Sequence, residues 1–171
     1  MIFGVHLDTY ELCVFVITDE TLDAVNKPAQ GTTETPINGW RVSMADAKEY
    51  PPFRDVPEIT APVNLNQKGL YPRFSGTVRY EGSFISQGEK IWTLELGEAG
   101  ETAEVFVNGA SAGVKVAPPY SFDLGSLVKE GSNSLRIEVT NTLVYRMHDG
   151  FSFWHPITAS GLVGPVKLMK G

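Results

Sequence analysis

Residues 135–140 read LRIEVT, and this stretch decides the fold. Leu135, Ile137 and Val139 alternate with charged or hydroxyl-bearing residues, which places the apolar side chains on one face of a strand and the polar ones on the other. The turn-forming sequence GSN at 131–133 precedes the strand. The pattern therefore predicts a strand with one face on a core and one face toward solvent.

The same period of two recurs along most of the chain. Residues 77–84, 91–96 and 103–107 alternate, and Asn108-Gly109 after the third favours a type I′ hairpin, because both positions of that turn need positive φ. The returning strand is expected at 111–116, a last strand at 166–169 and another at 40–44. Residues 122–124 are expected to open a short helical turn that extends to Leu127. Many short strands separated by turn signals predict an all-β sandwich.

The N-terminal part differs in composition from the rest. Residues 5–17 predict one or two strands, and the polar residues 18–37 read as a linker. We therefore predict an N-terminal extension over 1–37, which could end a preceding β domain, and a sandwich over 38–171. The prolines between residues 45 and 67 exclude a long helix there.

Charge and hydropathy exclude two classes of partner. The chain carries a net charge of −6, and its Lys and Arg residues form no cluster, so a nucleic-acid partner is not expected. No stretch approaches the roughly 20 apolar residues that span a bilayer, so no membrane partner is expected either. Cys13 lies in an apolar run and reads as a small buried side chain.

Six motifs, in order along the chain, resemble the sugar-binding jelly-roll, or galactose-binding-like, domain of glycoside hydrolases. They are FSGTVRY at 74–80 followed by Phe84, LELG at 94–97, AEVFVNG at 103–109, PPYSFD at 118–123, GSNSLRIEVTN at 131–141 and SGLVGPV at 160–166. The resemblance is to C-terminal domains of family 106 α-L-rhamnosidase-like enzymes and of family 2-related bacterial hydrolases.

This resemblance implies a non-catalytic accessory module, because such hydrolases keep their acid and base carboxylates on a separate barrel. The implied partners are a carbohydrate or the catalytic domain of a hydrolase. The implied location is periplasmic or extracellular, if the parent enzyme is secreted. Two functions stay open at this point: a module that binds glycan, and a purely structural module that buttresses a catalytic domain and has no ligand of its own.

The segment 145–155 carries the predicted carbohydrate site. An aromatic ring can cover the apolar face of a sugar, while Arg, His and Asp side chains bind its hydroxyls. The alternatives for this aromatic loop are packing against a neighbouring domain and plugging the end of its own sandwich. The candidate sugar-binding residues are Tyr145, Arg146, His148, Asp149, Trp154 and His155.

No pattern in the sequence predicts a catalytic residue. Glycoside hydrolysis needs two carboxylates that flank the scissile bond, and nothing brings together the candidates Glu95, Glu104, Glu138 and Asp149. Glu104 and Glu138 are read as solvated charges on outward strand faces. His148, Asp149, His155 and Ser160 match no triad or zinc spacing. We predict no cofactor; a structural calcium ion, which related folds often carry, stays open as an alternative, with ligands that the sequence does not locate.

Overall fold

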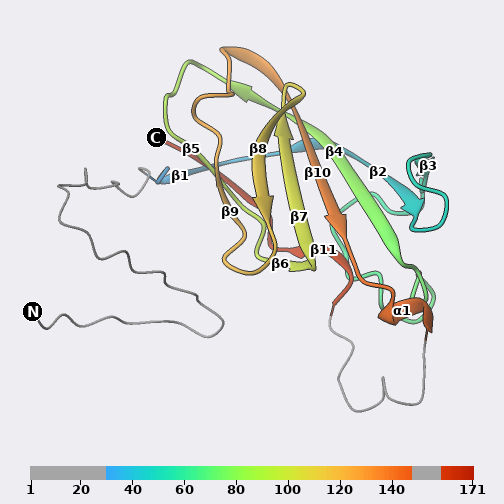
Figure 1. The fold of residues 1–171 in the computed structure, drawn as a ribbon. Coiled ribbons are helices and arrows are strands. Elements are labelled where there is room, and N and C mark those ends of the chain that lie inside the picture. The colour runs from blue at the N-terminus through green and yellow to red at the C-terminus, as the bar shows by residue number, and fades with distance from the viewer. Residues whose placement is uncertain (1–29, 148–158) are drawn as a thin grey trace, which may run out of the picture.

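The computed structural model describes residues 30–147 and 159–171, which form antiparallel β-sheets and one short helix (Figure 1). The larger sheet has the strand order β3-β2-β4-β10-β7-β8, and each neighbouring pair is antiparallel. Its strands, in that order, are Arg54–Asp55, Asn38–Asp46, Gly76–Ser86, Gly131–Thr140, Thr102–Val107 and Ala110–Lys115.

The opposing layer is formed by a four-stranded and a two-stranded sheet. The first has the order β1-β12-β5-β9 and contains Thr33–Thr35, Lys167–Lys170, Trp92–Glu95 and Ser121–Asp123. The second pairs β11 (Gly161–Gly164) with β6 (Glu98–Gly100). The helix α1 (Val144–Met147) follows β10. The predicted all-β sandwich is confirmed.

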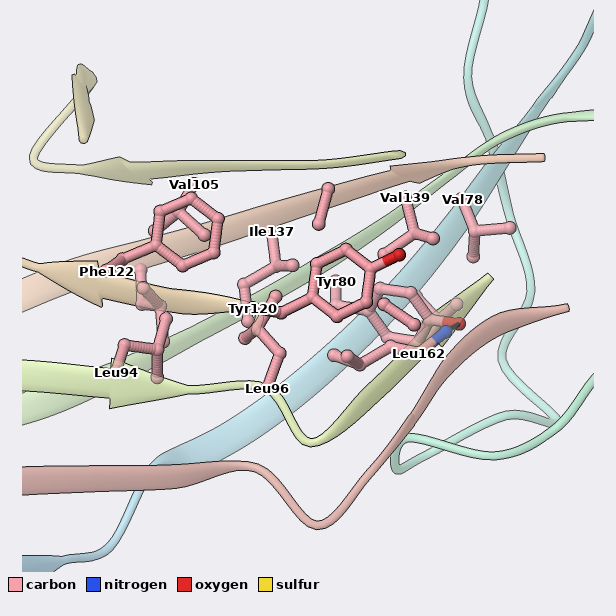
Figure 2. Packing of buried hydrophobic residues seen from close by; sticks show 14 of the residues in the cluster. Val78, Tyr80, Leu94, Leu96, Val105, Tyr120, Phe122, Ile137, Val139 and Leu162 are labelled. Atoms are coloured by element: carbon pink, nitrogen blue, oxygen red, sulfur yellow. Dashed lines mark hydrogen bonds between the residues drawn. The ribbon is translucent and has the colours of Figure 1, made fainter. Parts of the chain in front are cut away.

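One hydrophobic core fills the space between the layers. Tyr80 of β4, Ile137 of β10 and Leu94 of β5 are fully buried and belong to the same cluster. Figure 2 shows these side chains together between their strands. The Tyr80 hydroxyl accepts a hydrogen bond from the Leu162 backbone N–H at 2.9 Å, which ties β4 to β11 across the core. Burial raises the pKa of Tyr80 to about 12.

The alternation predicts the inward faces of the central strands correctly. Leu135, Ile137 and Val139 of β10 are at most 1% exposed. Trp92, Leu94 and Leu96 are likewise buried, whereas Trp40 is half-buried and packs against the edge of the core. The larger sheet therefore has one apolar face on the core. Its outer face carries the residues that alternate with the buried apolar ones along each strand.

The predicted hairpin joins β7 to β8. Asn108 has a φ of 52° and Gly109 a φ of 84°, as a type I′ turn requires. The Asn108 side chain also donates from Nδ2 to Asn133 Oδ1 at 2.7 Å and accepts from the Ser134 N–H at 3.1 Å. One residue thus shapes the turn and fastens it to β10.

The prediction that a helical turn begins at residue 122 is wrong about where the turn begins. Phe122 lies in strand β9, where it pairs with Leu94 of β5 and is 2% exposed. The turn begins after this strand, where the N–H of Leu127 donates to the carbonyl of Leu124 at 2.9 Å. Pairing with a strand distant in sequence and burial of an aromatic ring outweigh the local turn signal here.

The segment 45–67 contains no helix, as its prolines predict. Val56, Ile59 and Leu65 from this segment are buried against the core. The predicted strands within 5–17 and Cys13 lie outside the described residues. The division at residue 37 stays a prediction, and strand β1 before it pairs with β12.

Candidate functional site

The structure places two of the six predicted sugar-binding residues, and both hold α1 in position. Tyr145 is 1% exposed, and its hydroxyl donates to the carbonyl of Ala159 at 3.0 Å. Arg146 forms an ion pair with Asp46 at the end of β2, with Nη1 3.0 Å from Oδ1. The hydrogen bonds from Arg146 and from the N–H of Lys48 lower the pKa of the Asp46 carboxyl. These contacts fix α1 against the end of β2 and against Ala159.

The other four predicted residues, His148, Asp149, Trp154 and His155, lie outside the described residues. The sugar-binding role of the set therefore stays a prediction. Ser160, grouped in the sequence with the histidines, is buried, and its hydroxyl accepts a hydrogen bond from Asn141 Nδ2 at 2.8 Å. Among the described parts of the chain, no group of three or more His, Cys, Asp or Glu residues could hold a metal ion. The calcium alternative also stays a prediction.

A concavity of about 890 Å³ opens on the outer face of the larger sheet. This volume falls in the range of ligand sites, roughly 300–1,000 Å³. It extends from the segment after β2, across β4, β10 and β7, to β8. The residues that line it and matter most for its chemistry are Tyr50, Thr77, Thr102, Glu104, Glu138 and Thr140.

The sheet register brings the polar base of this concavity together. Thr77 lies opposite Thr140, and Thr140 lies opposite Thr102, which makes a row of three threonines across β4, β10 and β7. The hydroxyls of Thr77 and Thr140 are hydrogen-bonded at 2.8 Å. Thr77 is buried, so Thr140 and Thr102 are the hydroxyls of this row that can donate to or accept from a ligand.

The next row contains the two glutamates. Glu138 lies opposite Glu104 on one side and Arg79 on the other. Arg79 Nε contacts Glu138 Oε1 at 2.9 Å, and Arg136 Nε lies 3.4 Å from the same oxygen. Glu104 accepts a hydrogen bond from the Ser111 hydroxyl at 3.3 Å. Like charges directly opposite each other destabilise a sheet, and the arginines beside Glu138 offset part of that repulsion.

The aromatic side chain that lines the concavity is Tyr50, which is connected to these rows through Phe53 and Arg79. Tyr50 is 58% exposed, and its ring meets Phe53 edge-on at 6.0 Å between centroids. The guanidinium of Arg79 lies 3.6 Å from the centre of the Phe53 ring. Tyr50 is therefore joined through Phe53 and Arg79 to Glu138 at the base.

Sequence reasoning predicted the outward faces of Glu104 and Glu138 but not this site. Their direct opposition depends on strand register, which the alternation does not reveal. Tyr50 lies in the proline-rich segment, where no periodic signal marks a residue that lines the concavity. The remaining candidate carboxylates are elsewhere: Glu95 accepts a hydrogen bond from Ser121 at 2.7 Å on the four-stranded sheet, and Asp149 is outside the described residues.

No protein-family model matches the sequence. Over 74 residues the chain is 35% identical to a Formosa agariphila protein named "Putative beta-glucuronidase", a match that covers 40% of this chain and 6% of that protein. The chain thus spans a small fraction of this curated relative. In the described residues, no helix is long and apolar enough to cross a membrane.

Solved structures of glycoside hydrolases share the fold. A rhamnosidase from Novosphingobium sp. PP1Y matches with a TM-score of 0.67 and 25% identity, over 86% of this chain and 16% of that chain. A beta-glucuronidase from an uncultured Clostridium sp. matches with a TM-score of 0.57 and 20% identity, over 88% and 30%. An FMN-binding beta-glucuronidase from Facaelibacterium prausnitzii L2-6 matches with a TM-score of 0.54 and 24% identity, over 80% and 22%. The similarity is to one part of a much longer hydrolase.

Proposed function

We propose that this chain is a non-catalytic module of a glycoside hydrolase, of the galactose-binding-like jelly-roll type. The observation that supports this is the contrast in coverage: the rhamnosidase match includes 86% of this chain and 16% of the other. A sandwich of this size is one domain of such an enzyme, and the six motifs at 74–166 agree with that assignment.

The arrangement of Glu104 and Glu138 supports the absence of catalysis in this module. A glycosidase places its two carboxyl groups on either side of the scissile bond. Glu104 and Glu138 occupy opposed positions on neighbouring strands and project from the same face of one sheet. A saccharide lying on this face would therefore meet both carboxylates from the same side.

Hydrolysis assays on the purified chain test this proposal. We expect 4-nitrophenyl α-L-rhamnoside and β-D-glucuronide to release nitrophenol at the rate seen in buffer alone. Turnover above that rate, lost in Glu104→Gln or Glu138→Gln, would show that the chain is itself a hydrolase. The two variants guard against a contaminating enzyme, whose activity they would leave unchanged.

Within such an enzyme, we propose that the module contacts carbohydrate. The support is a concavity of suitable volume that combines an exposed aromatic ring, hydroxyls and carboxylates. Trp154, His148 and His155, which lie outside the described residues, are a second proposed set of glycan contacts. Binding by the isolated chain on a glycan array is the direct test, and a folded chain that binds nothing contradicts this role.

A structural role is the second candidate, favoured by the apolar side chains exposed around the same region. Val114 and Leu143 are each 52% exposed, and both line the concavity. Exposed apolar side chains that gather in one region are typical of protein contact surfaces. On this alternative the catalytic domain covers them, the isolated chain binds no glycan, and the linked catalytic domain loses thermal stability when the module is deleted.

A further inference from the structure

We infer that the outer face of the larger sheet is a binding site for an uncharged saccharide, with Tyr50 as the aromatic contact and Glu104 as the main hydroxyl acceptor. This inference rests on the proposed carbohydrate contact and moves its main location from the predicted loop to the sheet. It is carried by three observations on described residues: the shape of the concavity, the composition of its surface and the opposition of the two glutamates.

The surface composition matches the two-sided chemistry of a pyranose ring. Such a ring has apolar C–H faces and a belt of hydroxyls. Tyr50, Val114 and Leu143 line the concavity and are each more than half exposed, so they can cover C–H groups. The row of threonine hydroxyls and the carboxylate row lie on the sheet between them and can bind hydroxyls.

The opposed glutamates give a reason to expect a ligand rather than an ordinary solvated surface. Glu104 and Glu138 face each other across β7 and β10, an unfavourable pairing of like charges that Arg79 and Arg136 offset only from the Glu138 side. Local rules of this kind are broken most often at functional sites. A ligand hydroxyl that donates to Glu104 would relieve the repulsion that remains when it binds.

The site is held in place before a ligand arrives. Glu138 is fixed by Arg79, Arg79 lies on Phe53, and Phe53 supports Tyr50. The carboxylates and the threonines come from the central strands of a sheet rather than from loops. Little ordering is therefore left for the binding step, which favours affinity.

The charges select an uncharged saccharide over an acidic one. Of the three charged residues that line the concavity, two are glutamates and one is Lys48. Arg79 and Arg136 compensate Glu138, so Glu104 is the carboxylate that would repel a uronate on this surface, and the chain as a whole carries a net charge of −6. Neutral glycans are therefore expected to bind and polygalacturonate is not.

Affinity gel electrophoresis of the whole chain tests the site, with xyloglucan, galactan and arabinoxylan as neutral probes and polygalacturonate as the acidic one. We expect at least one neutral probe to retard the wild type. Tyr50→Ala and Glu104→Gln should each weaken this binding about tenfold or more. Glu81→Gln, on the same sheet face but outside the concavity, and the exposed Val116→Ala are matched controls that should bind as the wild type does.

The outcomes separate the sheet site from the proposed function. Loss of binding in Tyr50→Ala and Glu104→Gln, with unchanged melting temperatures, supports the sheet site. Loss in Trp154→Ala alone overturns the sheet site and leaves the proposed carbohydrate contact standing. Retardation by polygalacturonate alone overturns the choice of an uncharged ligand. A folded wild type that no probe retards overturns the carbohydrate contact and the sheet site together.

Discussion

At the scale of single residues, Tyr80 stabilises the core in two ways: its ring is buried, and its hydroxyl accepts a hydrogen bond from the Leu162 N–H. Tyr80→Phe keeps the ring and removes the acceptor of the Leu162 N–H, which then stays buried without a partner. We expect the free energy of unfolding to fall by about 1–3 kcal/mol, measured by urea denaturation. Tyr71→Phe is the matched control, because its hydroxyl meets Glu58 in an exposed pair, and its effect should stay within about 0.5 kcal/mol. Equal effects of the two variants would contradict this account.

Glu89 gives the protein a dependence on acid pH. The hydrogen bond from Lys170, at 2.6 Å, together with backbone N–H groups, lowers the pKa of Glu89 from 4.5 to about 2. A carboxyl whose pKa is lower in the folded state contributes stability above its unfolded pKa and loses it as the pH falls toward the folded value. The contribution should therefore be complete at pH 6 and disappear progressively between about pH 4.5 and 2.

Urea denaturation of the wild type and Glu89→Gln at several pH values measures this contribution. We expect the two midpoints to differ at pH 6 and to converge toward pH 2. Lys170→Gln should reproduce the loss at pH 6, and the double variant should be no worse than either single one. Additive effects of the two substitutions would show that Glu89 and Lys170 do not act as a pair.

At the scale of elements, two substitutions in the β7–β8 turn measure the contribution of backbone conformation and that of side-chain hydrogen bonds to stability separately. Gly109→Ala introduces a Cβ that meets nothing within 4 Å, so only the positive φ opposes it, and we expect a loss of about 1 kcal/mol. Asn108→Gly tolerates the positive φ but removes the hydrogen bonds to Asn133 and Ser134. The expected loss is larger, about 1–3 kcal/mol. Thermal unfolding measures both losses of stability. A larger loss for Gly109→Ala than for Asn108→Gly would contradict the role given to the Asn108 amide.

The elements that sequence reasoning predicted are those with a local signal. Strands β4, β7 and β10 are long enough to show alternation, and Asn108-Gly109 marks its own turn. Strands β1, β3 and β6 have two or three residues each, too few for a period to appear. Phe122 carried a turn signal, but its partner is Leu94 on β5, and pairing over that distance in sequence is set by the core.

The candidate site was harder to predict because it is assembled from distant parts of the chain. Tyr50 precedes β3, Glu104 belongs to β7 and Glu138 to β10, and only the finished sheet brings them to one concavity. Conversely, Tyr145 is a residue type common in ligand contacts, but in the structure its side chain is buried and its hydroxyl binds the carbonyl of Ala159. The alternation predicted which way Glu104 and Glu138 point, whereas strand register determined which residues they lie beside.

At the scale of the whole molecule, the first described strand supports the sheet that contains the last one. Strand β1 pairs with β12, and the N–H of Thr32 donates to the carbonyl of Lys170 at 3.0 Å. A chain that starts at residue 38 would leave β12 as an edge with unpaired backbone groups. We expect it to be less stable than a chain that starts at residue 30 by more than about 1 kcal/mol, measured by urea denaturation. Equal stability of the two would show that β1 is dispensable.

The pairing of β1 with β12 also determines how the domain responds to mechanical tension. Thr33 lies opposite Lys170, so these two residues lie at the same end of the antiparallel β1–β12 pair. A force applied through these two residues pulls β1 away from β12 from one end, and their hydrogen bonds break one after another instead of sharing the load. Under such tension we therefore expect β1 to separate from β12 before the larger sheet and the core are disturbed.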